Sequence, residues 1–167
     1  MKQYNLLFAD LDGTLIEPVT TNPFPQGVWD MKFKFDVLDK IKELKPEVLF
    51  IVTNQGGIES GFVHKKHWEQ KMKYICASIR EYCGVDVWYE MCPSNKKEHP
   101  DRKPNTGMID KCMKTYFQPE FLNLEDALMI GDASGKPGQF SNSDLKCAEN
   151  CNMDYMDIAD FINTSFS

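Results

Sequence analysis

Two carboxylates stand two residues apart where an apolar run ends. Asp10 and Asp12 follow the run Leu6–Ala9, and Gly13 indicates that the chain turns directly after them. Side chains two residues apart on an extended chain leave it on the same side. A cation between the carboxylates would offset their repulsion, and the pair could act as nucleophile and general acid/base. A solvated Asp-x-Asp-Gly turn would explain the same residues without chemistry.

Further polar groups stand where strands end or a helix begins. Thr53 and Asn54 close an apolar run and precede two glycines, and a hydroxyl with free backbone N–H groups suits a phosphoryl oxygen. Lys103, followed by proline, could act as a positioned charge on a phosphate. Asp132 follows the apolar run Ala127–Ile130 and one glycine. Taken singly, each of these is also explained as a turn or a helix cap.

Taken together, these residues form a set suited to phosphoryl transfer. Asp10, Asp12 and Asp132 offer the oxygen ligands that Mg²⁺ prefers. Thr53 and Lys103 add a hydroxyl and a positive charge. The chemistry requires that all of them meet at one edge of a sheet.

Apolar strands alternate with amphipathic helices along the chain. The patterns predict strands over Tyr4–Ala9, Val48–Val52, Val85–Met91 and Ala127–Ile130. They predict helices over Phe35–Leu44, Lys65–Tyr82, Thr106–Phe117 and Asp157–Phe161. This alternation indicates an α/β fold, a Rossmann-like parallel sheet with helices on both faces. Ligands of such sheets bind at the carboxyl ends of the strands.

Length and composition fit one soluble domain. The 167 residues suffice for a single domain over 1–167, with an irregular flap loop at 14–34 and a basic loop at 92–104. We expect no membrane segment and no signal peptide. The six cysteines form no C-x-x-C pair and mostly lie in apolar patterns, which indicates free thiols in a reducing cytosol, so we expect a cytoplasmic location. The net charge of −6 gives no global attraction to nucleic acid.

Four segments of the chain resemble the motifs of the haloacid dehalogenase superfamily of phosphatases. They are DLDGTL, the strand ending in TN, the lysine of RKP, and the strand ending in IGD. The resemblance implies that Asp10 forms an aspartyl-phosphate and that Asp12 protonates the leaving oxygen and then activates water. The implied phosphate-binding residues are Leu11, Thr53, Asn54 and Lys103. The implied Mg²⁺ ligands are Asp10, the backbone carbonyl of Asp12, and Asp132.

Longer segments resemble the polynucleotide kinase 3′-phosphatase family. These are GTLIEPVTTNPFPQGVWDMKF, TNQGGIESG, RKPNTGM and GDASGKPGQFSNSDLKCAEN. This resemblance implies removal of 3′-phosphates from DNA or RNA ends, as in DNA repair, and places Asp144 near the metal. No G-x-x-x-x-G-K-[ST] loop is present, so we expect no kinase domain in this chain. No stretch is long enough for a large cap domain, and an open site would suit a bulky substrate. The partner is therefore a phosphorylated substrate, with a nucleic-acid 3′ end as the first choice.

Two other functions remain open. Histidinol-phosphate and heptose bisphosphate phosphatases share the RKP-GM segment, and they typically carry a zinc loop just before it. Here only Cys92 and His99 lie in that loop, whereas structural zinc usually needs four ligands, so zinc is not expected. A catalytically inactive binding module of the same fold is the second alternative. Against it, every residue that the chemistry requires is present.

Aromatic residues in the loops would help to hold a nucleic-acid end. Phe24, Trp29 and Phe140 could stack on bases. Basic pairs flank the motif loops, but each also reads as a solvated surface. The 3′-end prediction therefore depends on the family resemblance.

Overall fold

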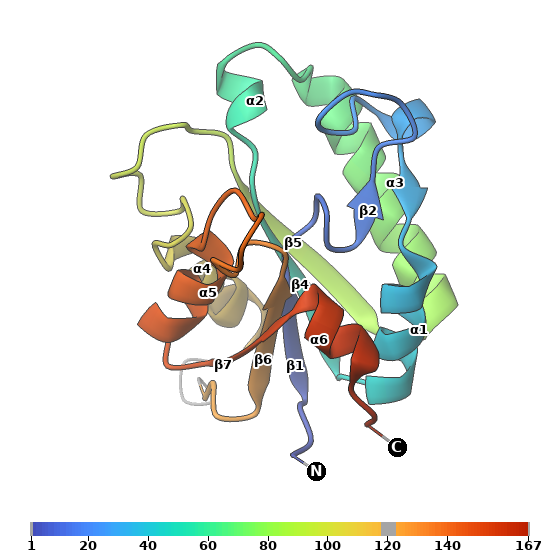
Figure 1. Ribbon diagram of the computed structural model, residues 1–167, viewed down its shortest axis with the longest axis vertical. Coiled ribbons are helices and arrows are strands. Elements are labelled where there is room, and N and C mark those ends of the chain that lie inside the picture. Colours follow the sequence, from blue (N-terminus) through green and yellow to red (C-terminus); the bar gives the residue numbers. More distant parts are fainter. Residues whose placement is uncertain (1, 118–122, 167) are drawn as a thin grey trace.

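A computed structural model describes residues 2–117 and 123–166 of the protein (Figure 1). Its strands are β1 Leu6–Ala9, β2 Ile16–Glu17, β3 Lys32–Phe33, β4 Val48–Asn54, β5 Asp86–Cys92, β6 Ala127–Gly131 and β7 Asp154–Asp157. Its helices are the 3₁₀ turn η1 Val28–Asp30, and α1 Phe35–Leu44, α2 Gly56–Glu59, α3 Lys65–Cys83, α4 Gly107–Tyr116, α5 Ser143–Asn150 and α6 Ile158–Asn163.

Five strands form one parallel sheet in the order β5-β4-β1-β6-β7. In the central strand β1, Leu6 is paired with Val48 on one side and with Ala127 on the other. This confirms the predicted Rossmann-like α/β fold. Within the described residues no large domain is inserted between the strands, and the short β2–β3 hairpin and α2 are the additions next to the sheet.

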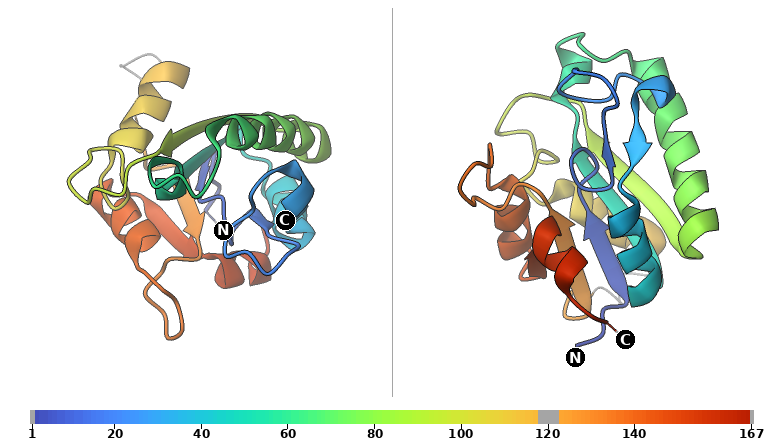
Figure 2. Two further views of the ribbon diagram at one scale, coloured as in Figure 1. Left: turned by 90° about the horizontal axis from the view of Figure 1, so that it is seen from above. Right: turned by 45° about the vertical axis from the view of Figure 1, so that its right-hand side comes forward.

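Helices cover both faces of the sheet (Figure 2). Along β1, Leu7 and Ala9 point into the core under α1, α3 and α6, whereas Leu6 and Phe8 point into the core under α4 and α5. This alternation follows from the two-residue period of a strand. The central strands are buried on both faces, which explains their uninterrupted apolar sequences.

The two helices before and after β4 end where local sequence stops them. The predicted range of α1 is confirmed at both ends, and Lys45 follows it in the left-handed conformation just before Pro46. Helix α3 runs one residue past its predicted end, and Gly84 caps it at a φ of 69°. Glycine adopts this conformation without a Cβ penalty.

Several short elements were not predicted. The segment 14–34, expected to be irregular, contains β2, η1 and β3, and the two strands pair antiparallel. Strand β7 and helices α2 and α5 were also missed. Elements of two to eight residues show too few turns or alternations for a periodic pattern to reveal them. None of the helices in the described residues has the length and hydropathy needed to cross a bilayer.

The core under α6 provides a test of the packing. Phe161 is fully buried there, so Phe161→Ala should lower the free energy of unfolding by about 3–5 kcal/mol. The matched control is Phe140→Ala, because Phe140 is exposed and should change stability by no more than about 0.5 kcal/mol. Urea unfolding measures both variants. Equal losses would contradict the assignment of Phe161 to the core.

Candidate active site

The carboxyl ends of three neighbouring strands meet at one edge of the sheet, and the predicted polar residues lie there. Asp10 directly follows β1, and its backbone N–H donates to the Ile130 carbonyl at 3.1 Å. Asp132 directly follows β6, and Thr53 is the penultimate residue of β4. The structure therefore brings together side chains that are up to about 120 residues apart in sequence.

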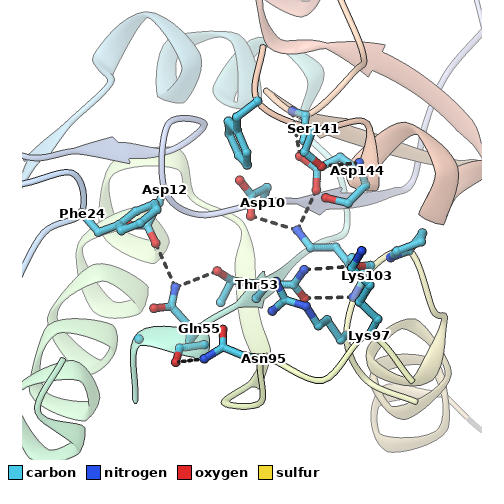
Figure 3. Close-up of a pocket in the computed structure, with 18 of the residues that line it drawn as sticks. Asp10, Asp12, Phe24, Thr53, Gln55, Asn95, Lys97, Lys103, Ser141 and Asp144 are labelled. Carbon is cyan, nitrogen blue, oxygen red and sulfur yellow. Dashed lines mark hydrogen bonds and ion pairs between the residues drawn. The ribbon is translucent and has the colours of Figure 1, made fainter. Parts of the chain in front are cut away.

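Lys103 lies between two carboxylates (Figure 3). Its Nζ is 2.9 Å from Asp10 Oδ1 and 2.7 Å from Asp144 Oδ1. Lys103 is only 4% exposed, and Asp144 is fully buried. Because a buried charge is costly unless it is paired, these three side chains depend on one another.

The cluster shifts the pKa of each member. Burial raises the pKa of Asp10 to about 6, although the Lys103 ammonium opposes this rise. Burial also raises the pKa of Asp144 to about 6, again against Lys103. Burial alone would lower the pKa of Lys103, but the two carboxylates outweigh it and raise that pKa. Lys103 is therefore charged at neutral pH.

Asn54 holds the backbone on which Lys103 stands. Its Oδ1 accepts from the Lys103 N–H at 2.9 Å, and its Nδ2 donates to the Lys103 carbonyl at 3.1 Å. The family resemblance implied that Asn54 binds phosphate, and Asn54 lines the open pocket together with Asp10 and Lys103. In this structure its side-chain amide is bound to the Lys103 backbone and so helps to fix the position of Lys103.

Gln55 is a site residue that the sequence analysis missed. Its Nε2 donates to Asp12 Oδ2 at 2.9 Å and to Thr53 Oγ1 at 2.8 Å. Burial raises the pKa of Asp12, while nearby Lys71 and the Gln55 hydrogen bond act in the opposite direction. The available signal was its spacing: Thr53 and Gln55 are two residues apart at the end of β4 and so share a side.

The donor set fits a hard divalent cation. Asp10, Asp132 and Asp144 each offer one oxygen, and these oxygens lie within 4.8 Å of one another. Asp132 Oδ1 is buried without a hydrogen-bond partner. A Cβ on Gly13, which has a φ of 82°, would lie 2.1 Å from Asp132 Oδ2, so only glycine leaves that carboxylate its place. An unpartnered buried carboxylate oxygen is what a bound cation would satisfy.

Asp144 lies closer to the centre of the site than the sequence suggested. It stands in the first turn of α5, and its Oδ2 accepts from the Ala133 N–H at 3.1 Å. A Cβ on Gly131 would lie 2.3 Å from the same oxygen, so the glycine of the IGD segment makes room for it. Asp144 therefore contacts Lys103 directly and also belongs to the possible metal group.

An open pocket of about 810 Å³ lies above these groups. Its mouth carries three exposed aromatic side chains, Phe24 in segment 14–34, Phe62 before α3, and Phe140 in the loop before α5. Lys97 and Arg102 of the basic loop also line it. Such a volume is in the range that accommodates a ligand of nucleotide size.

The side chains of two residues singled out in the sequence lie outside the pocket. Trp29 does not line the pocket, and its ring packs against that of His67 at 4.9 Å between centroids. The side chain of Leu11 is fully buried in the core, so only its backbone is available to a phosphate.

The side chains of Cys92 and His99 lie in contact in the basic loop. Cys92 Sγ is 3.6 Å from His99 Nδ1, and that nitrogen also accepts from the Asp101 N–H at 3.1 Å. Burial raises the pKa of the Cys92 thiol. The neutral thiol and the imidazole therefore help to shape the turn that leads to Lys103.

Comparison with known proteins shows which family model the chain matches. The family model described as polynucleotide kinase 3 phosphatase matches residues 5–161. An uncharacterised 20.8 kDa protein of Autographa californica nuclear polyhedrosis virus is 31% identical, with 96% of this chain and 87% of that protein covered. The bifunctional polynucleotide phosphatase/kinase of Schizosaccharomyces pombe is 30% identical over 89% of this chain. The match spans only 35% of the yeast protein.

A solved structure shares the fold. It is the D,D-heptose 1,7-bisphosphate phosphatase from B. bronchiseptica complexed with magnesium and phosphate, with a TM-score of 0.69 and 21% identity. The alignment covers 93% of this chain and 79% of that chain. At this identity the likeness concerns the fold alone.

Removing the charge of Lys103 should expose the cost of the two carboxylates. Without metal at pH 7, Lys103→Met should lower the free energy of unfolding by about 3–5 kcal/mol, because two buried charges lose their partner. Burial holds the folded-state pKa of Asp10 and of Asp144 above the ordinary aspartate value of 3.8. Stability from these groups is therefore present at low pH and is lost as the pH rises through about 6. The loss in the variant should shrink between pH 7 and pH 5.

Urea unfolding in EDTA at several pH values measures this. The matched control is Lys111→Met, which removes a lysine that pairs with Asp101 and is half exposed. That change should cost less than about 1 kcal/mol. A loss in Lys103→Met that does not vary with pH would contradict the electrostatic origin.

Proposed function

This chain is a phosphatase of the haloacid dehalogenase superfamily and belongs to the polynucleotide kinase 3 phosphatase family, and we propose that it removes 3′-phosphates from nucleic-acid ends through an aspartyl-phosphate on Asp10. The observation that supports this most directly is the placement of the Asp10 carboxylate 2.9 Å from a buried ammonium in an open pocket. A nucleophile and a positive charge side by side are what phosphoryl transfer requires.

The first step uses the Asp10 carboxylate. One of its oxygens attacks phosphorus, the bond between phosphorus and the leaving oxygen breaks, and an aspartyl-phosphate forms. Lys103 and Thr53 hold the phosphoryl oxygens. Because the Thr53 hydroxyl accepts from Gln55, its own proton is left to donate to such an oxygen. Asn54 acts by fixing Lys103, and Leu11 offers its backbone.

Asp12 transfers the protons. It gives a proton to the leaving oxygen in the first step, and takes one from the water that attacks the aspartyl-phosphate in the second. Free phosphate leaves, and Asp10 and Asp12 return to their starting states. Burial raises the pKa of Asp12, which favours the protonated acid at the start. The hydrogen bond from Gln55 orients the carboxyl group.

Mg²⁺ is the cofactor that the donor set fits. Asp10, the backbone carbonyl of Asp12, and Asp132 would hold it, with Asp144 beside them. When bound, it supplies positive charge that neutralises the phosphoryl oxygens. The unpartnered oxygen of Asp132 supports this assignment.

The pocket mouth supports a nucleic-acid end as the substrate. The exposed side chains of Phe24, Phe62 and Phe140 offer faces on which a base can stack. Lys97 and Arg102 can contact a neighbouring backbone phosphate. The pocket is far larger than a phosphate group alone needs.

A small phosphate ester is the second candidate. The net charge of −6 repels a polyanion at long range. Phe24 and Phe140 would then border a smaller substrate, and the chemistry on Asp10 would be the same. The choice of leaving group is therefore separate from the mechanism.

Asp10→Asn should lower turnover on the order of 10⁴-fold or more, because an amide cannot form the aspartyl-phosphate. The melting temperature should stay near the wild-type value, because Asp144 still pairs with Lys103 and the lost carboxylate is one of several buried together. Phosphate release from a small ester with Mg²⁺ measures activity, and circular dichroism measures the fold. Activity at the wild-type level in this variant would sink the covalent mechanism.

Two controls accompany that assay. Asp126→Asn removes an exposed carboxylate at the opposite end of the sheet, so its activity should match wild type. Adding EDTA to wild type should abolish turnover, and excess Mg²⁺ should restore it. Full activity in EDTA would remove Mg²⁺ from the proposal.

The substrate is tested by comparing a 3′-phosphorylated DNA oligonucleotide, the same oligonucleotide phosphorylated at its 5′ end, and histidinol phosphate. We expect kcat/KM to be at least about 10-fold higher for the 3′ end, because the pocket must place both phosphate and sugar. Initial rates at low salt with Mg²⁺ measure this. A preference for histidinol phosphate would favour the second candidate.

A further inference from the structure

Lys71 is a buried charge that the proposed reaction does not use. It lies on the core-facing side of α3 beside Trp68, Met72 and Ile75, and is 1% exposed. A methionine would pack there without the cost of burying an ammonium group. A lysine at this position therefore indicates a specific partner for its charge.

The partners of Lys71 belong to segment 14–34 and to the turn after β1 that carries Asp12. Its Nζ donates to the Pro25 carbonyl at 3.2 Å. Burial lowers the pKa of Lys71, and the nearby carboxylates of Asp12 and Asp30 oppose this. The ammonium is therefore bound to the backbone of the segment that carries Phe24, at the residue next to it.

Segment 14–34 is internally organised around Asp30. This buried carboxylate accepts from the Thr20 N–H and hydroxyl, from Asn22 Nδ2 and from the Gln26 N–H, at 2.6–3.2 Å. The segment is therefore a built loop whose position is set by what it rests on. Lys71 provides such a support through the carbonyl of Pro25, the residue that follows Phe24.

We propose that Lys71 is a positioning residue for substrate binding. By holding the Pro25 carbonyl against α3, it fixes the adjacent Phe24 at the pocket mouth, where that ring contacts the terminal nucleoside of the substrate. This inference rests on the proposed function, since it names a contact beyond the phosphate. The buried ammonium of Lys71 thus serves recognition of the leaving group.

A thermodynamic cycle tests this. Lys71→Met, Phe24→Ala and the double variant are assayed on the 3′-phosphorylated oligonucleotide and on acetyl phosphate, which has no ring to stack. Lys71→Met should raise KM for the oligonucleotide by about 5-fold or more, in line with the loss of one stacked base. The change in kcat/KM for acetyl phosphate should be several-fold smaller. The double variant should match Phe24→Ala, because both changes act on one contact.

The matched control is Lys40→Met. Lys40 is a partly buried lysine of α1 whose ammonium pairs with Glu43 of the same helix, and its loss should leave both KM values at the wild-type level. Asp30→Asn loosens the same segment from within and should raise the oligonucleotide KM as Lys71→Met does. It keeps the test open if Lys71→Met fails to fold.

Four results would overturn the inference. The first is an oligonucleotide KM that stays at the wild-type level in Lys71→Met or Asp30→Asn. The second is a double variant in which the effects of Lys71→Met and Phe24→Ala add. The third is an equal loss of kcat on both substrates, which would mean that Lys71 acts on Asp12. The fourth is a wild-type protein that turns over acetyl phosphate but not the oligonucleotide. That last result overturns the proposed substrate as well, and it is recognised without any variant.

Discussion

The ion cluster of Lys103, Asp10 and Asp144 is the interaction on which the site depends. A parallel sheet delivers carboxylates from separate strands to one edge, where burial disfavours their charge. One ammonium, 2.9 Å and 2.7 Å from two of them, offsets this cost. The chain makes room for the arrangement with bare glycines, because a Cβ at Gly13 or Gly131 would collide with a carboxylate. The close packing of the carboxylates and the compensation of their charge therefore depend on the same few residues at this sheet edge.

Chemistry and recognition stand on different parts of the fold. The groups proposed to react, Asp10 and Asp12, lie just after strand β1, and sites built on strands are held more precisely than sites on loops. The aromatic rim stands on loops, and two of these loops are each organised around a buried carboxylate. Asp30 gathers the segment that presents Phe24. Asp157 accepts from Ser134 and Gln139 in the loop that presents Phe140. Hydrogen bonds to a buried carboxylate therefore hold the backbone of each loop that presents an exposed ring.

Electrostatics act at short range in this protein. The net charge is −6, and the positive groups at the pocket are few. A polyanionic substrate would gain little from long-range steering, so its binding would depend on direct contacts with the phosphate and with the bases. Dependence on short-range contacts suits a site that binds the terminal nucleotide of a strand and makes no contacts along the rest of it.

The sequence by itself determined four of the five strands of the sheet, the helices α1, α3, α4 and α6, and the position of two acidic residues at one sheet edge. Asp10 and Asp132 could be placed because each directly follows an apolar strand, and parallel strands end at one edge. The end of α1 could be placed because Pro46 follows it, whereas α3 runs to Cys83, one residue past its predicted end, where Gly84 caps it. The tertiary structure alone decided that Asn54 holds the backbone of Lys103, that Gln55 orients Asp12, and that Lys71 supports Pro25. Periodicity reports only whether a side chain is buried. Which atoms it meets depends on distant segments that come together when the sheet assembles.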